Sequence, residues 1–108
     1  MMRNMAGMMK KVQDMQARLE TLQTELNSKH FSASAGNGYV TATVIGNGTL
    51  HAIKIDPRVI DRNDAEMLED LICLATRNAQ DVASAEKARL LKDITGGLPL
   101  PPGMNLPF

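Results

Sequence analysis

Side chains that commonly carry catalysis or bind metals are scarce in this chain. Its one cysteine, Cys73, and its two histidines, His30 and His51, have no second ligand at the spacing of a metal site. Cys73 lies between Ile72 and Leu74, a setting typical of a chemically inert thiol. We therefore expect no enzyme, no catalytic residue, no metal, no cofactor and no small-molecule substrate.

The tripeptide Gly-Asn-Gly occurs twice, at residues 36–38 and 46–48. Such loops can hold a phosphate, but a dinucleotide-binding loop leads from a strand into a helix, whereas a strand-like segment follows each tripeptide here. Asn-Gly also supplies the two positive φ angles of a type I′ hairpin turn. The tripeptides therefore predict two tight turns, centred on Asn37-Gly38 and Asn47-Gly48, in a three-stranded antiparallel meander.

These turns predict a register that separates an apolar face of the sheet from a more polar one. The first turn pairs Phe31 with Val44, Ala33 with Ala42, and Ala35 with Val40. The second turn pairs Val44, Ala42 and Val40 with His51, Ile53 and Ile55. All of these residues share one face, and we expect His51 at its rim.

A heptad pattern predicts a long helix from about Met5 to Asn27, pressed against another helix. Its seam is the candidate dimer or helix-packing surface: Met5, Met8, Val12, Met15, Leu19, Leu22 and Leu26. The flexible methionine side chain fits many packing arrangements and favours none of them. The N-terminal half of the seam, which is rich in Met, should therefore pack more loosely than the C-terminal half. The helix either packs on a core or partner along its length, or forms an arm whose basic flank contacts a partner.

A second helix is predicted after Asn63, which can cap it, with Glu66 completing a capping box. The glycines after Thr95 should end it. One face carries the residues expected to cover the sheet: Leu68, Leu71, Ile72, Ala75, Ala79, Val82 and Ala83. The expected fold class is α+β, with helix, meander and helix in two layers.

Charge is balanced overall, with 12 basic and 12 acidic residues, but it is unevenly placed. Residues 1–18 are basic, whereas residues 56–70 are acidic, as suits the start of a helix. The candidate DNA-binding residues are Arg3, Lys10, Lys11 and Arg18 on the first helix and Lys87, Arg89 and Lys92 on the second. Basic side chains on a helix suit contacts with duplex phosphates. With two Phe, one Tyr and no Trp, the chain has few aromatic side chains that could stack on exposed bases.

Three motifs occur in order: Ile55-Asp56-Pro57, then residues 66–71 (EMLEDL), then the Pro-rich stretch at 98–108. With the N-terminal helix and the hairpins, they make the chain resemble the YbaB/EbfC family of bacterial nucleoid-associated proteins over essentially all 108 residues. The resemblance implies a tweezer-shaped homodimer with the first helices as paired arms. It also implies binding to double-stranded DNA with low sequence specificity and a role in nucleoid organisation and gene regulation.

We expect a single domain over residues 1–108, with a helical arm at 1–29, the sheet at 30–56, a helix and its lead-in at 57–97, and a Pro-rich tail at 98–108. The tail either docks on the body of the dimer or serves as a docking peptide for a protein partner. The chain has a single cysteine and no apolar run long enough to span a membrane. We therefore expect the protein to be located in the cytoplasm, at the nucleoid, and to have no membrane partner. The alternative function is a protein-interaction module for a replication or recombination factor, with incidental DNA affinity.

Overall fold

The computed structural model describes residues 2–95 of the chain, with side chains from 5 to 94. The elements follow in the order α1 (Met2–Ser28), β1 (His30–Ala35), β2 (Val40–Ile45), β3 (Leu50–Ile55), the 3₁₀ helix η1 (Pro57–Val59) and α2 (Ala65–Thr95). This is the expected α+β arrangement, and α1 extends three residues beyond its predicted start and one beyond its predicted end.

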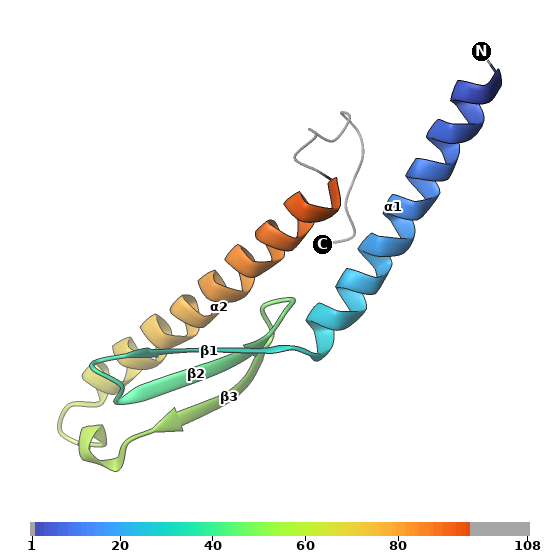
Figure 1. Ribbon diagram of the computed structural model, residues 1–108. Helices are drawn as coiled ribbons and strands as arrows, with labels where there is room; N and C mark the ends of the chain where they lie inside the picture. Colours follow the sequence, from blue (N-terminus) through green and yellow to red (C-terminus); the bar gives the residue numbers. More distant parts are fainter. Residues whose placement is uncertain (1, 96–108) are drawn as a thin grey trace.

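The molecule is elongated, with principal extents of 73 × 23 × 19 Å. The three strands form one antiparallel sheet in the order β1-β2-β3. α2 lies along one face of this sheet, while the N-terminal half of α1 extends beyond the end of α2 (Figure 1). The fold therefore places a projecting helix on a small two-layer body.

The first hairpin has the predicted register. Phe31 lies opposite Val44, and Ala35 lies opposite Val40. Asn37 has a φ of 58° and Gly38 a φ of 90°, and the Tyr39 amide donates to the Gly36 carbonyl at 3.3 Å. Positive φ at both central residues is the requirement of a type I′ turn, so this part of the prediction is confirmed.

The second hairpin differs from the prediction. Its turn closes one residue earlier, because the Gly48 amide donates to the Ile45 carbonyl at 2.8 Å, and Gly48 has a positive φ whereas Asn47 does not. The loop therefore holds three residues instead of two, which shifts the register at the start of β3.

The shift places Leu50, and not His51, opposite Val44, so the predicted Val44–His51 pair is wrong. The predicted pairings of Ile53 and Ile55 are confirmed. His51 is exposed and its ring stacks on that of His30, with centroids 4.4 Å apart, so it does not lie at the rim of the buried face.

The core lies between the sheet and α2. Ala75, Ala79 and Ala83 are at most 1% exposed, and they face Val40 and Val44, which are fully buried. Small side chains four residues apart form one line along a helix, so α2 approaches the sheet closely. The predicted covering face is right in these alanines and wrong for Val82, which is 45% exposed although it lies on the same side of α2 as Ala75.

The start of α2 is capped by Asp64, whose Oδ1 accepts from the Met67 amide at 3.3 Å. The predicted cap, Asn63, instead belongs to the preceding turn, where its amide donates to Asp61 Oδ1 at 2.9 Å. The acidic side chain is the stronger partner for the positive end of the helix dipole. The glycines expected to end α2 and the Pro-rich tail lie outside the described residues.

Candidate nucleic-acid interface

Three candidate DNA-binding residues of α1 form an exposed basic stripe, which we define as Lys10, Lys11 and Arg18. At about 100° per residue they fall within an arc of about 100°, and Lys10 and Arg18 are about 12 Å apart along the axis. None of the three has an ion-pair partner among the side chains that the structure describes. Arg3, seven residues before Lys10, belongs to the same helix, but its side chain lies outside that described part.

One carboxylate lies within the basic stripe. Asp14 is exposed and stands four residues after Lys10 and four before Arg18, so it shares their side of the helix. Its negative charge lowers the positive potential of the stripe at its centre. The local charge is therefore weaker than three cations alone would produce.

The predicted seam lies about 120° around α1 from the basic stripe, and it divides into two parts. Near the sheet, Leu22 and Leu26 are only 5% and 2% exposed, Leu19 is also buried, and Met15 is half-buried. Towards the N-terminus, Met5 and Met8 are each 66% exposed, and Val12 is 42% exposed. The leucine half of the seam is thus covered within the subunit, whereas the N-terminal half lies bare beside the basic stripe.

The C-terminal end of α1 is held by the second hairpin. The Gly46 amide donates to the Leu26 carbonyl at 2.8 Å, and a Cβ at Gly46 would lie 2.5 Å from Leu26 Cβ. Only glycine allows the hairpin to come this close to the helix backbone. This contact fixes where α1, and with it the basic stripe, leaves the body.

The three candidate residues of α2 are not brought together. Arg89 lies about 160° around the helix from Lys87, and Lys92 about 140° from it. Lys87 is half-buried and lines a recess with the hairpin loop 46–48, whereas Lys92 is exposed. Arg89 and Lys92 lie about 60° apart on one side of α2, whereas Lys87 lies on the other side, so the three form no single basic surface.

Arg89 is engaged by acidic neighbours. Its Nη2 lies 2.6 Å from Glu86 Oε1, and its Nη1 lies 3.6 Å from Asp93 Oδ2. The hydrogen bond from Arg89 holds the pKa of Glu86 below its ordinary value, and the same bond raises the pKa of Arg89. Because Arg89 already has two carboxylate partners, it is a poorer phosphate ligand than the cations of the basic stripe.

Two features were missed by the sequence reasoning. The stacked His30–His51 pair lies beside the register shift at the start of β3, which no local pattern signals. Lys29, at the α1–β1 junction, lies 5.6 Å from the centre of the Phe31 ring and 3.9 Å from Glu86. The sequence did offer one signal for Lys29: it is a cation three residues after Leu26, the last residue of the apolar seam.

Within residues 2–95, no cluster of three or more His, Cys, Asp or Glu side chains could hold a metal ion. Among the same residues, neither helix is long and apolar enough to cross a membrane.

Comparison with known proteins gives consistent matches. A family model described as the YbaB/EbfC DNA-binding family matches residues 1–98. A protein of Rhizobium meliloti (strain 1021) named nucleoid-associated protein is 43% identical over 107 residues, covering 99% of this chain and 100% of its own. A protein of Brucella ovis with the same name is 45% identical with the same coverage. A crystal structure of an uncharacterised protein from Helicobacter pylori is 18% identical, has a TM-score of 0.68, and is aligned over 79% of this chain and 89% of that chain, which shows the common fold.

Proposed function

Because this chain belongs to the YbaB/EbfC DNA-binding family, we propose that it is a nucleoid-associated protein that binds duplex DNA through the basic stripe of α1. The family is one of DNA-binding proteins and not of enzymes. The observation that carries the proposal is the group of exposed cations, Lys10, Lys11 and Arg18, without acidic partners among the described side chains.

The mechanism is electrostatic. Lysine and arginine side chains replace the counterions condensed on DNA phosphates, so affinity falls as salt concentration rises. A helix presenting cations over about 12 Å contacts backbone phosphates and reads no bases, which gives low sequence specificity. Such binding suits a role in nucleoid organisation and gene regulation, and a cytoplasmic location at the nucleoid.

The proposal includes a homodimer of single-domain subunits in which residues 1–29 form the arm. It is supported by the bare N-terminal half of the seam, where Met5, Met8 and Val12 continue the heptad of the buried leucines. A second copy would cover this strip and present two basic stripes to one duplex. In this proposal Arg3, seven residues before Lys10 on the same helix, is a further contact, and Lys87 and Lys92 are secondary contacts near the C-terminal end of α2.

The test is fluorescence anisotropy of a labelled random-sequence duplex, titrated at several salt concentrations. The double substitution Lys10→Ala and Lys11→Ala should weaken binding equally on unrelated duplexes. It should also make the negative slope of log affinity against log salt less steep, by about 0.9 for each phosphate that the variant no longer neutralises. The matched control, Lys54→Ala with Arg62→Ala, removes two exposed cations outside α1 and should leave the slope unchanged. If the two double variants had the same slope of log affinity against log salt, the basic stripe would not be the DNA-binding site.

A second candidate function is favoured by the exposed methionines. Met5, Met8 and Met9 are between 63% and 66% exposed, and flexible thioether side chains suit adaptable protein contacts. In this alternative, α1 engages a replication or recombination factor, and DNA affinity is incidental. It predicts no binding to bare DNA at physiological salt, whereas the leading proposal predicts measurable binding there.

A further inference from the structure

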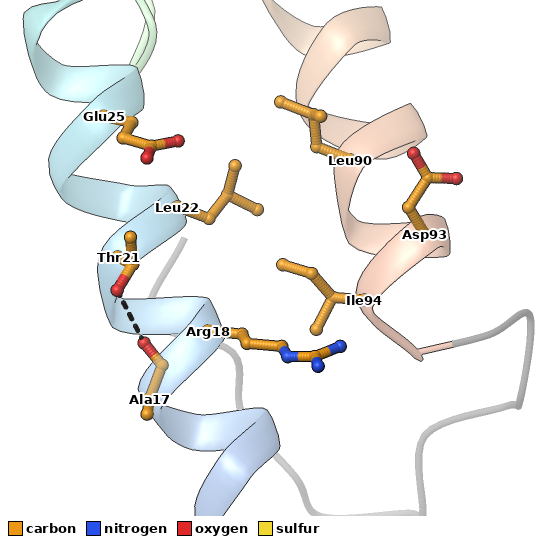
Figure 2. Close-up of a pocket in the computed structure, with 8 residues that line it drawn as sticks. All are labelled: Ala17, Arg18, Thr21, Leu22, Glu25, Leu90, Asp93 and Ile94. Atoms are coloured by element: carbon orange, nitrogen blue, oxygen red, sulfur yellow. Dashed lines mark hydrogen bonds between the residues drawn. The ribbon is translucent and has the colours of Figure 1, made fainter.

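A groove of about 370 Å³ lies between α1 and α2, next to the last described turn of α2. Its floor is formed by Leu22 of α1 and by Leu90 and Ile94 of α2, whose side chains point towards one another (Figure 2). Charged residues surround this floor: Arg18, Glu25 and Asp93. Leu90 and Ile94 are only half-buried, so part of the apolar floor is still exposed and could be covered by further apolar side chains.

The chain continues directly from this groove. Ile94 lines it, and the residues that follow Thr95 begin with Gly96-Gly97. Two glycines allow the backbone conformations needed for a reversal of direction. A segment that leaves the end of α2 therefore starts beside the groove and can turn back into it.

The composition of this following segment matches the groove. Residues 96–108 contain no charged side chain, and their apolar members are Leu98, Leu100, Met104, Leu106 and Phe108. Four prolines, at 99, 101, 102 and 107, exclude a helix and favour extended chain, which has little conformational entropy to lose on docking. The segment adds no side-chain carboxylate beside Glu25 and Asp93.

The length is also sufficient. Residues 17–25 of α1, which line the groove, span about 12 Å. Extended chain of the polyproline type advances about 3.1 Å per residue, so residues 98–108 can reach about 30 Å. The segment is long enough to fill the groove and to remain tethered to α2.

We propose that residues 98–108 of the same chain dock in the groove between α1 and α2, with Leu98 and Leu100 on the floor formed by Leu22, Leu90 and Ile94. The docked segment joins the two helices where they separate and sets the angle of the projecting arm. It lies next to Arg18, the innermost cation of the basic stripe. This inference is independent of DNA binding.

The test uses the full chain with Cys73→Ser, because Cys73 is exposed and would react. Thr21→Cys places a thiol in the groove, and Gln16→Cys places the control thiol about 140° away around α1. The rate of alkylation of each thiol is divided by its rate in denaturant. A segment docked nine-tenths of the time should slow the Thr21→Cys thiol about tenfold.

Adding Leu98→Ser and Leu100→Ser should restore the fast rate at position 21 and leave position 16 unchanged. Equal normalised rates at the two positions, or protection that survives the leucine substitutions, would overturn the proposal. Protection that increases with protein concentration would also overturn it, because a second copy would then be the occupant. Glu25→Cys provides a second groove position if Thr21→Cys fails to fold, as judged by circular dichroism.

Discussion

The substitution Gly46→Ala tests how α1 is held on the body. The added Cβ would lie 2.5 Å from Leu26 Cβ and 2.6 Å from its carbonyl carbon, so the hairpin would have to move away from the helix. Overpacking of this kind costs about 1–3 kcal/mol, and loss of the hydrogen bond from the Gly46 amide to Leu26 costs about 1 kcal/mol. The lower entropy of alanine in the unfolded chain returns about 0.4–1 kcal/mol, so we expect a net loss of about 2 kcal/mol.

The assay is urea unfolding followed by circular dichroism, at one protein concentration so that association does not alter the comparison. The matched control is Gly7→Ala, where a Cβ meets nothing within 4 Å. This change should stabilise the exposed helix by up to about 1 kcal/mol, because glycine is the poorer helix former. A free energy of unfolding for Gly46→Ala within about 0.5 kcal/mol of the unchanged protein would refute the reasoning, since the close contact would then have no energetic weight.

Three further outcomes are expected. Asp14→Asn should raise DNA affinity about twofold at low salt, and less at high salt, because it removes the carboxylate within the basic stripe; anisotropy measures it. Asp64→Ala should lower the free energy of unfolding by about 1 kcal/mol through loss of the α2 cap, whereas Asn63→Ala should change it less, as measured by urea unfolding. The pKa of Glu86 is lowered from its ordinary 4.5, so the folded protein binds this proton less readily than the unfolded chain. Its stabilisation is therefore complete at neutral pH and is lost as pH falls below about 4.5. Glu86→Gln should thus be less stable than the unchanged protein at pH 7, and the difference should shrink at about pH 3, when urea midpoints are compared.

Most of the fold follows from local patterns in the sequence. The heptad from Met5 to Leu26 predicts α1, and Asn37-Gly38 predicts the first turn and its register. The alanines at 75, 79 and 83 predict the face of α2 that meets the sheet. Each signal depends on residues that are close in sequence or on one face of one element.

The errors arise where distant segments decide the outcome. Gly46 contacts Leu26, twenty residues earlier, and this contact accompanies the three-residue loop that displaces His51 from its predicted partner. Likewise, nothing local distinguishes Met8 from Leu22 on the heptad, although the body covers only Leu22. The choice between Asn63 and Asp64 as the cap depended on the turn at Asp61.

The candidate site was predictable in part. Lys10, Lys11 and Arg18 could be placed on one side of a helix from their spacing alone. The separation of Lys87 from Arg89 also follows from helical geometry, but the partners of Arg89 follow only from the side-chain positions.

The projecting half of α1 behaves mechanically as a stiff rod fixed at one end. The cations on the rod keep their mutual spacing, because the backbone hydrogen bonds of the helix do not stretch. Their position relative to the sheet depends on the angle at the fixed end, and a tilt of about 10° would move the tip of a rod of about 22 Å by about 4 Å. The helix therefore fixes the spacing of its cations, while the contact between Gly46 and Leu26 sets the direction in which they project from the body. A change of that angle would move the cations as one group and leave their mutual spacing unchanged.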